Sequence, residues 1–343
     1  MSVDVDLRHH GDAELDTGLV DLAVNVRRQQ PPAWLRAELA ASLDGLASYP
    51  RSAVAREVVA ARHRRPAEQV LLTAGAAEAF TLIARALQPR HAVVVHPQFT
   101  EPEAALRAAG HDVHRQLLDA ADGFVLRPAD VPDGADLVVV GNPTNPTSVL
   151  HPADELRALA RPGRVLVVDE AFLDAIPGEP ESLAAATDVP GLLVVRSLTK
   201  TWGLAGLRVG YLLGAVDLVT RLAEVQPPWS VSTPALVAAQ ACTTTAAVAE
   251  ADATARVAVT HREYLLDLLR DVPGVEVVGV PRAPFVLLRV RDGLGVREAL
   301  RQRGFAVRRG DTFPGLGPDW LRIAVREPGV TESFVQTLSE VLR

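Results

Sequence analysis

The 343-residue chain is poor in several features, and each scarcity excludes a class of protein. Its only cysteine is Cys242, which rules out an intrachain disulfide and any metal site built on cysteine pairs. No apolar run reaches the roughly 18 residues of a membrane-spanning helix, and the first residues hold no apolar segment of signal-peptide length. We therefore expect a soluble, cytoplasmic protein without membrane contact.

Excess positive charge is also missing, since the formal net charge is −7 and the arginines are dispersed among acidic residues. Nucleic-acid binding needs basic residues gathered on one face, so we expect no nucleic-acid partner. The adjacent pair Arg64 and Arg65 indicates a solvated helix end. Cys242, in a stretch rich in alanine and threonine, indicates a small buried filler rather than a metal ligand.

Lysine is almost absent, because Lys200 is the only one among the 35 basic residues and all others are arginine. Arginine replaces lysine in most surface roles, but its guanidinium stays protonated and cannot form a Schiff base. The one remaining lysine amine therefore indicates a catalytic role, such as forming a Schiff base. Chance survival in an arginine-biased composition would leave the same pattern, so the surrounding residues must decide.

Short runs of valine and leucine alternate with longer segments of helical periodicity. Apolar runs without polar alternation are typical of strands covered on both faces. Repeated strand–helix units predict an α/β fold, with a mostly parallel sheet sandwiched by helices. We expect strands at 70–72, 92–95, 136–140, 165–169, 192–196 and 209–213, with helices at 77–87, 101–109 and 153–160.

The pattern changes after Pro227 and Pro228. An alanine-rich stretch over about 234–269 predicts one long helix, and the rest predicts a smaller α+β part with more antiparallel pairing. Its expected strands are 275–278, 285–290 and 321–325, and its expected helices are 296–303 and a last one ending at 343. We expect an arm with little regular structure over 1–30 that packs with the small domain, a large domain over 31–230 and a small domain over 231–343.

Lys200 lies in the segment Ser-Leu-Thr-Lys-Thr-Trp-Gly-Leu-Ala-Gly-Leu-Arg, directly after an expected buried strand. Burial lowers the pKa of an amine and makes it a nucleophile toward an aldehyde. Ser197 and Thr199 supply hydroxyl groups nearby, and Arg208 supplies a guanidinium fork that suits a phosphate. The segment fits an aldehyde cofactor that carries a phosphate.

Two other expected strand ends carry polar side chains. Asp169 ends an apolar run, where a buried carboxylate needs a cationic partner such as a protonated pyridine nitrogen; the alternative is a cap on the next helix. The turn 141–147 reads Gly-Asn-Pro-Thr-Asn-Pro-Thr, and its two Asn-Pro steps favour an extended backbone. Asn145 in this turn can donate its amide to a phenolate oxygen, although a plain loop would also contain such residues.

Small residues and an aromatic residue follow two further strands. Gly75, Ala76 and Ala77 open a helix after the strand 70–72, where a phosphate can approach the backbone N–H groups; an ordinary tight turn would look the same. Phe99 follows the strand 92–95 and can lie flat against an aromatic cofactor, or fill the core. All these segments follow strand carboxyl ends, where open α/β sheets bind ligands.

The Ser-x-x-Lys…Arg spacing, the Asp-Glu-Ala-aromatic strand end and the Asn-Pro-Thr turn together resemble the class I/II aminotransferase family of fold type I pyridoxal-phosphate enzymes, over essentially the whole chain. The resemblance implies pyridoxal 5′-phosphate as cofactor, with Lys200 forming the Schiff base and later moving the Cα proton. It implies that Asp169 pairs with the pyridine nitrogen. It further implies that Asn145 bonds the ring hydroxyl, that Phe99 stacks on the ring, and that the phosphate is held by Ser197, Thr199, Arg208 and the backbone of Gly75, Ala76 and Ala77.

The resemblance also concerns the substrate and the assembly. Tyr49, in Ser-Tyr-Pro-Arg, matches a tyrosine that reaches the phosphate in the neighbouring subunit, which implies a homodimer. Arg322 matches the arginine that clamps the substrate's acidic group, and Asn25 matches a substrate-facing asparagine. Phe172 stands where many members carry a tyrosine, so the phenol bond to the cofactor oxygen is missing.

Two groups within the family are the most similar: histidinol-phosphate aminotransferases and the threonine-phosphate decarboxylases of cobalamin biosynthesis. The segment Trp-Gly-Leu-Ala-Gly-Leu-Arg after the lysine resembles the first group; the segment around His10 and the Ala-Val-Arg ending at Arg326 resemble the second. Both act on phosphorylated substrates, so Arg322, Arg326 and His10 are candidates for binding a substrate phosphate. His10 is alternatively a solvent-exposed residue of a mobile arm.

The Cα bond held perpendicular to the cofactor plane is the one that breaks, so Lys200 and Asp169 by themselves do not choose between the two reactions. We expect transamination of a small, phosphorylated amine or amino acid, with threonine-phosphate decarboxylation as the alternative. A regulatory relative that binds the cofactor without catalysis is disfavoured, because the chain has no basic patch and no attached DNA-binding segment.

Overall fold

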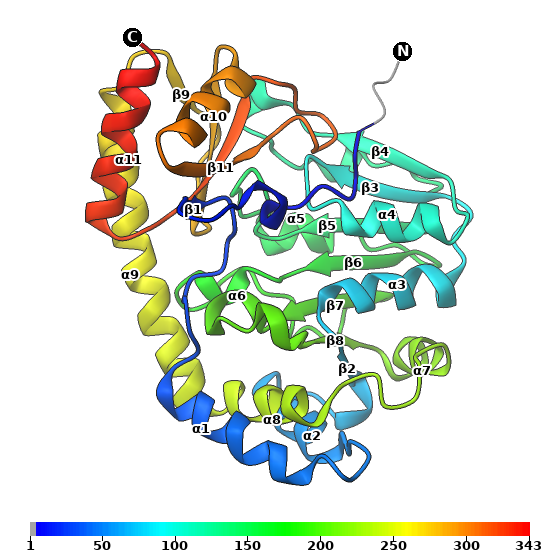
Figure 1. Ribbon diagram of the computed structural model, residues 1–343. Coiled ribbons are helices and arrows are strands. Elements are labelled where there is room, and N and C mark those ends of the chain that lie inside the picture. Colours follow the sequence, from blue (N-terminus) through cyan, green and yellow to red (C-terminus); the bar gives the residue numbers. More distant parts are fainter. Residues whose placement is uncertain (1–4) are drawn as a thin grey trace.

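A computed structural model describes residues 5–343 and contains two β-sheets with helices packed against them (Figure 1). Seven strands form the larger sheet in the order β2-β8-β7-β6-β5-β3-β4, and five form the smaller one in the order β1-β11-β12-β10-β9. Within the larger sheet β3, β4, β5, β6 and β7 run parallel, while β8 is antiparallel to both β2 and β7. The expected α/β fold class, a mostly parallel sheet sandwiched by helices, is confirmed.

The strands of the larger sheet are buried on both faces because successive valines and leucines point to opposite sides. In β5, for example, Val138 and Val140 join the core on one face, while Leu137 and Val139 join the core on the other. The strands are β2 (Val70–Thr73), β3 (Ala92–His96), β4 (Val113–Leu117), β5 (Leu137–Gly141), β6 (Val165–Asp169), β7 (Leu192–Ser197) and β8 (Gly210–Gly214).

Helices cover both faces of this sheet. One face packs against α3 (Ala76–Leu87), α4 (Glu101–Ala108) and α7 (Val216–Glu224). The other packs against α1 (Ala33–Ser42), α2 (Ala53–Arg62) and α8 (Thr233–Cys242), with α5 (Ala153–Arg157) on the same side. The short helix α6 (Thr199–Trp202) follows β7.

The smaller sheet has its own core of leucine, valine and phenylalanine side chains. Its strands are β1 (Val20–Leu22), β9 (Val275–Val277), β10 (Phe285–Val290), β11 (Phe305–Arg309) and β12 (Trp320–Ala324). Its helices are α9 (Thr245–Arg270), α10 (Gly293–Gln302) and α11 (Pro328–Val341). Figure 1 shows α9 running along one side of the molecule, from the region of α1 to the smaller sheet.

Three expectations are corrected. The stretch 234–269 is two helices and not one, because the Thr244 hydroxyl accepts the N–H of Ala247 and begins α9 anew. Two strands, β4 and β11, are present where the sequence pattern predicted none, and β11 pairs in parallel with β1, the short strand of the arm. Arg65 is buried rather than solvated, and its guanidinium donates to the carbonyl oxygens of Ala184 and Ala186.

Cys242 is buried and free, as expected. Within residues 5–343 every helix is too short or too polar to cross a lipid bilayer. The division at residues 30 and 230 stays a prediction. In the structure the larger sheet uses residues 70–214, whereas the smaller sheet combines residues 20–22 of the arm with residues 275–324.

Candidate active site

A cavity of about 460 Å³ lies where the carboxyl ends of the larger sheet's strands meet the arm and the smaller sheet. It is lined by side chains from segments that are far apart in the sequence. Among the residues proposed from the sequence, the lining includes His10, Asn25, Ala76, Ala77, Phe99, Asn145, Asp169, Phe172, Ser197, Thr199, Lys200, Arg208 and Arg322. The strand-end argument therefore brings most of the candidate residues together in space.

The parallel register explains why these side chains converge. Gly141 at the end of β5 pairs with Asp169 at the end of β6, and Asp169 pairs with Val195 in β7. Asn145 therefore lies just after the end of β5, and Asp169 is the last residue of β6. Lys200 lies three residues after Ser197, the last residue of β7. Polar side chains are tolerated here because they face the cavity and not the sheet's apolar cores.

Lys200 faces the cavity with the ring of Phe172 beside it, 5.7 Å from Nζ to the ring centroid. Burial lowers the pKa of the Lys200 amine to about 8, helped by the positive charges of Arg322 and Arg208, although Asp169 acts in the opposite direction. An amine with this pKa is far more often unprotonated near neutral pH than an ordinary lysine. Lys200 is therefore suited to attack an aldehyde.

Asp169 lies in the wall of the cavity and is 7% exposed. Burial and the neighbouring Glu170 raise the pKa of Asp169 to about 6, while the N–H of Ala171, which donates at 3.0 Å, and the Lys200 amine lower it. Such a buried carboxylate would be stabilised by a cation. The protonated ring nitrogen of pyridoxal phosphate is a cation of the right kind.

The expected phosphate site is built around the start of α3. Gly75 begins this helix with φ +80°, and no side chain caps the helix, so its first N–H groups remain available. A Cβ at position 75 would lie 2.6 Å from Nη2 of Arg208, so the guanidinium is packed directly on the glycine. Ser197 and Thr199 are buried and line the same cavity. This donor set fits a phosphate dianion.

Asn145 and Arg322 meet in the wall of the cavity, where Nη1 of Arg322 donates to Oδ1 of Asn145 at 2.7 Å. A second N–H of Arg322 bonds the carbonyl oxygen of Ala23, and the side chain is 4% exposed. Burial and the neighbouring Arg308 lower the pKa of Arg322 to about 9. Its Nε has no hydrogen-bond partner among the described residues, and neither has the amide of the buried Asn25. These groups remain free to bind a ligand.

His10 and Phe99 lie side by side, with ring centroids 5.5 Å apart, and both line the cavity. Nε2 of His10 lies 2.7 Å from a carboxylate oxygen of Glu101, so the histidine is anchored and not a free residue of a mobile arm. Gly75 touches the site through Arg208 but does not itself line the cavity.

Two of the sequence candidates lie elsewhere. Arg326 is not among the cavity-lining residues, and its guanidinium donates to the carbonyl oxygens of Asp21 and Val24. Tyr49 lies on the outer surface, 72% exposed, and its ring stacks on Trp229 with centroids 4.3 Å apart. Neither placement tests the roles that the resemblance implies for these residues.

The structure also adds residues that the sequence interpretation missed. Arg308, from β11, lines the cavity and is 2% exposed, with its guanidinium over the ring of Phe313 at 4.7 Å. Burial lowers the pKa of Arg308 to about 10, although the carboxylate of Glu14 acts against this. The sequence did offer a signal for Arg308, the two adjacent arginines in Val-Arg-Arg. They could be placed beside the cavity only once the segment was known to be a strand, β11, which the sequence pattern did not predict.

Comparisons with known proteins agree with this geometry. The sequence profile described as aminotransferase class I and II matches residues 17–342. A histidinol-phosphate aminotransferase of Mycobacterium tuberculosis is 52% identical over 322 residues, which cover 93% of this chain and 87% of that protein. A threonine-phosphate decarboxylase of Salmonella typhimurium is 31% identical over 347 residues, covering 94% and 91% of the two chains.

Solved structures share the fold. The histidinol-phosphate aminotransferase of Clostridium acetobutylicum superimposes with a TM-score of 0.84 at 22% identity, covering 93% of this chain and 98% of its own. The L-threonine-O-3-phosphate decarboxylase of Porphyromonas gingivalis superimposes with a TM-score of 0.82 at 23% identity, covering 94% and 98%. At these identities the likeness concerns the fold alone.

Proposed function

This chain belongs to the aminotransferase class I and II family, and from this premise we propose that it transfers the amino group of a small phosphorylated amine, with histidinol phosphate as the leading candidate. Its cofactor is pyridoxal 5′-phosphate, as in the family. The proposed substrate is that of the histidinol-phosphate aminotransferases that are 52% identical to this chain.

When bound, the cofactor supplies an aldehyde that condenses with amines and a ring that accepts the electron pair of a broken bond at Cα. We propose which residues of the chain would hold the ring and the phosphate of the cofactor. Asp169 would pair with the ring nitrogen, Nδ2 of Asn145 would donate to the ring oxygen, and Phe99 would stack on the ring. Arg208, Ser197, Thr199 and the first turn of α3 hold the phosphate.

Lys200 is the proposed base that moves the Cα proton: its amine would take the proton from Cα of the donor and pass it to the carbon that carried the aldehyde, and the second half of the reaction would run this transfer in reverse. The depressed pKa of its amine, about 8, places its change of protonation near working pH, where a general base is most effective. The arm and the smaller sheet, which wall the cavity on one side, would limit the access of water to this proton transfer. These roles stay proposals for the individual residues.

The observation that carries the substrate class is the pair of buried arginines in the cavity wall. Arg308 and Arg322 are 2% and 4% exposed, and both reach the cavity from the smaller sheet. Two buried guanidinium groups facing one cavity are costly unless an acidic ligand meets them, and arginine forks match phosphate and carboxylate oxygens. Asn25 adds an unpartnered buried amide to the same wall.

The test is a turnover assay of the purified holoenzyme. We expect repeated turnover of histidinol phosphate only when a 2-oxo acid such as 2-oxoglutarate is present. Without the 2-oxo acid, one equivalent of histidinol phosphate should bleach the cofactor's visible absorption in a single turnover. Histidinol lacking the phosphate should be a much poorer donor. Consumption of neither compound would overturn the proposed substrate.

A second candidate, decarboxylation of threonine phosphate, is favoured by the placement of His10. The arm segment around His10 resembles the decarboxylase group, and the structure brings this histidine into the cavity beside Phe99. The same assay distinguishes the two reactions. Release of carbon dioxide from threonine phosphate without any 2-oxo acid would show that the reaction is decarboxylation and not transamination. The protein would then be assigned to cobalamin biosynthesis.

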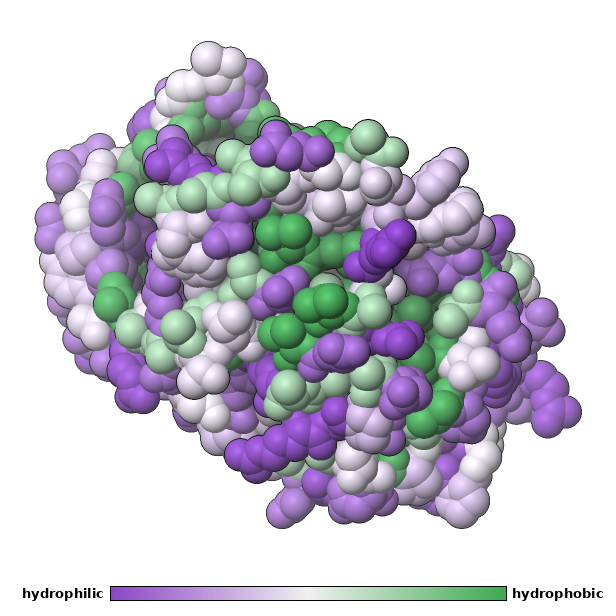
Figure 2. Space-filling model, turned by 90° about the horizontal axis from the view of Figure 1, so that it is seen from below, coloured by the Kyte–Doolittle hydropathy of each residue, from purple (hydrophilic) through white to green (hydrophobic). Residues whose placement is uncertain are grey.

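We also propose that two copies of the chain form a homodimer and that Tyr49 of each completes the other's site. Tyr49 and Trp229 are 72% and 59% exposed although they stack on each other, and Leu43, Leu46 and Val54 are exposed nearby in the sequence. Figure 2 shows apolar atoms gathered on the face that carries α1, α2 and α8. A surface of this kind is typical of an interface.

Mixing two inactive variants tests the dimer. Dimers of Lys200→Ala and of Tyr49→Ala each lack one component of every site, whereas a mixed dimer regains one intact site. We expect activity to recover to about a quarter of the wild-type value after subunit exchange. A monomer in sedimentation, or no recovery between variants that are both dimeric, would contradict the proposal.

We propose the cytoplasm as the location of the protein. The support is the single, buried and free Cys242, because proteins of oxidising compartments commonly rely on disulfides. Fractionation of cells with an antibody against the chain tests this, and recovery from a secreted or membrane fraction would contradict it.

A further inference from the structure

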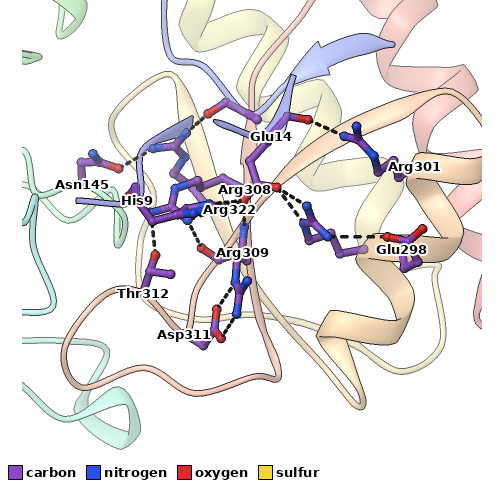
Figure 3. A network of polar contacts seen from close by, with 12 residues as sticks. His9, Glu14, Asn145, Glu298, Arg301, Arg308, Arg309, Asp311, Thr312 and Arg322 are labelled. Atoms are coloured by element: carbon purple, nitrogen blue, oxygen red, sulfur yellow. Dashed lines mark hydrogen bonds and ion pairs between the residues drawn. The ribbon is translucent and has the colours of Figure 1, made fainter. Parts of the chain in front are cut away.

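The arm that precedes α1 forms one side of the cavity and holds the two cavity arginines of the smaller sheet, Arg308 and Arg322. Residues 10–12 and 23–26 line the cavity from this segment. Its carbonyl oxygens accept hydrogen bonds from the two guanidinium groups: His9 accepts from Nη2 of Arg308 at 2.7 Å, and Ala23 accepts from Nη2 of Arg322 (Figure 3). The orientation of both arginines therefore depends on where the arm lies.

Arg308 has few other constraints. Its Nη1 donates to the carbonyl oxygen of Arg309 at 2.9 Å, and its Nη2 also donates to the hydroxyl of Thr312 at 2.6 Å. Both of these partners come from β11 or the loop after it, so they travel with Arg308. The His9 carbonyl is the hydrogen-bond acceptor that ties this guanidinium to another part of the chain, and the Glu14 carboxylate adds a longer ion pair at 3.7 Å.

The arm is fastened beside that contact by Glu14, which is 1% exposed. One carboxylate oxygen accepts two N–H groups of Arg297 in α10, at 2.7 Å from Nε and 2.5 Å from Nη2. The other lies 2.9 Å from Nε2 of His9 and 3.7 Å from Nη1 of Arg308. Arg301 in the same helix donates to the Glu14 carbonyl oxygen at 2.7 Å.

Glu14 thus joins α10 to the very residue whose carbonyl orients Arg308. Burial would raise the pKa of Glu14, but hydrogen bonds from His9 and Arg297 outweigh this and leave it below the ordinary value. The carboxylate is therefore charged when the arm is in place. Its shortest contacts are with Arg297 and not with Arg308, so its main effect on Arg308 runs through His9.

We propose that Glu14 is a positioning residue for substrate binding: it locks the arm onto α10 and so holds Arg308 in the orientation that meets the substrate's acidic group. The proposal rests on the proposed function, because it takes Arg308 to be part of the site for that acidic group. Glu14 touches neither the reacting atoms nor the cofactor.

A purely electrostatic role predicts the opposite result and can be separated from positioning. If Glu14 only offset the charge of Arg308, its removal would make the cavity more positive and anions would bind more tightly. If Glu14 positions the arm, its removal weakens anion binding because the His9 carbonyl no longer holds the guanidinium. The sign of the change in affinity therefore decides between the two roles.

The matched control is Asp16→Asn. Asp16 belongs to the same arm and binds the same helix, since its carboxylate accepts Nη2 of Arg301 at 2.9 Å. It is exposed and has no contact with His9 or Arg308 among the contacts in the described chain. Asp16→Asn therefore removes an ion pair between the arm and α10 without touching the path to Arg308.

The experiment compares wild type, Glu14→Gln and Asp16→Asn as holoenzymes. Inorganic phosphate is titrated as the probe, followed by the change in cofactor fluorescence, and KM and kcat are measured with the phosphorylated donor that the wild type accepts. We expect Glu14→Gln to bind phosphate about tenfold or more weakly and to raise KM by a similar factor. We expect kcat and the cofactor absorption spectrum to change little, and Asp16→Asn to stay within about twofold of wild type.

Three outcomes would overturn the proposal. Unchanged or tighter phosphate binding by Glu14→Gln would show that Glu14 does not position Arg308, and wild-type turnover would still support the proposed function. An equal loss in Asp16→Asn would show that any tether of the arm has the same effect. A wild type that binds no phosphate would refute both this inference and the proposed substrate class. If Glu14→Gln does not fold, Arg297→Gln probes the same contact from α10 with the same expected sign.

Discussion

Arg322 and Asn145 are joined by a hydrogen bond of 2.7 Å, from Nη1 of the guanidinium to Oδ1 of the amide. Because arginine can only donate, this bond fixes which end of the amide faces Arg322. The Nδ2 of Asn145 is then the group left to donate to an oxygen of the cofactor ring. One contact therefore links the arginine proposed to bind the substrate to the asparagine proposed to bind the cofactor.

Arg322→Lys should impair both substrate binding and the cofactor environment. Lysine keeps the charge but cannot bond Asn145 and Ala23 at once and still offer a donor to a ligand. We expect KM for the amino donor to rise about tenfold to a hundredfold, as for a lost hydrogen bond to a charged group, and the visible absorption maximum to shift. Arg289→Lys is the control, because Arg289 is exposed on neighbouring strand β10. A change in KM without any spectral shift would contradict the link through Asn145.

Asp169 should make the cofactor-free protein less stable as the pH rises. Its pKa is raised to about 6 in the fold from an ordinary value of 3.8, so between these values the unfolded chain loses a proton that the folded chain keeps. The free energy of unfolding should therefore fall by about 3 kcal/mol, relative to Asp169→Asn, as pH rises from about 3 to 7.

Urea unfolding of both cofactor-free proteins across this pH range measures the difference. Binding of the cofactor should reduce it, because a protonated ring nitrogen compensates the ionised carboxylate. Equal pH dependence of wild type and Asp169→Asn would show that Asp169 has an ordinary pKa in the fold.

The sequence was sufficient for six of the seven strands of the larger sheet and for the residues at their ends, but not for β4, whose Val-His-Arg-Gln-Leu segment is no apolar run. Uninterrupted apolar runs predict strands buried on both faces, and polar residues such as Asn145 and Asp169 stand out where those runs stop. The parallel arrangement then brings such residues to one edge, whichever side chains lie in between. Both the apolar runs and the polar residues that end them can be recognised within a few neighbouring residues of the sequence.

The arginine cluster could not be read in the same way, because its contacts join segments almost 300 residues apart. β1 pairs with β11, and this pairing places the arm's carbonyl oxygens against Arg308, Arg322 and Arg326. The residues that flank these three arginines in the sequence do not show which guanidinium bonds only carbonyl oxygens and which ones line the cavity. Arg326 was proposed for the substrate, whereas the structure brings Arg308 to the cavity.

Arg196 was likewise visible only as the polar end of a strand. In the structure it is 3% exposed and bonds Glu170 at 3.0 Å and Glu179 at 2.8 Å, on the sheet directly beside Asp169. Arg196→Ala would leave the buried Glu170 without its cation, while Glu179 keeps its ion pair with Arg62. We therefore expect a loss of about 3–5 kcal/mol in stability and a clearly lower Tm. Arg256→Ala, which breaks an exposed pair within α9, should cost less than about 1 kcal/mol. Similar Tm values for the two variants would contradict this account of the buried network.

Lys200 permits a test that few chains of this length allow, because it supplies the only ε-amine. Reduction of the holoenzyme with borohydride should fix the cofactor to a single peptide, the one that contains Lys200, as read by mass spectrometry. The chain's α-amino group is the other amine that could react, and Lys200→Arg measures that background. An adduct that persists undiminished in Lys200→Arg, or that is absent from the wild-type peptide, would remove Lys200 from the proposed role.

The rate at which cofactor-free protein recombines with pyridoxal phosphate should report the pKa of this amine. Only the unprotonated amine attacks the aldehyde, and burial lowers the pKa of Lys200 from 10.5 to about 8. The rate should therefore rise with pH and level off above about 8, instead of rising toward 10.5. Because Arg322 and Arg208 contribute to the lowered pKa, Arg322→Gln should move the midpoint to higher pH. A midpoint that stays fixed in this variant would show that the charge of Arg322 does not contribute to the lowered pKa of the amine.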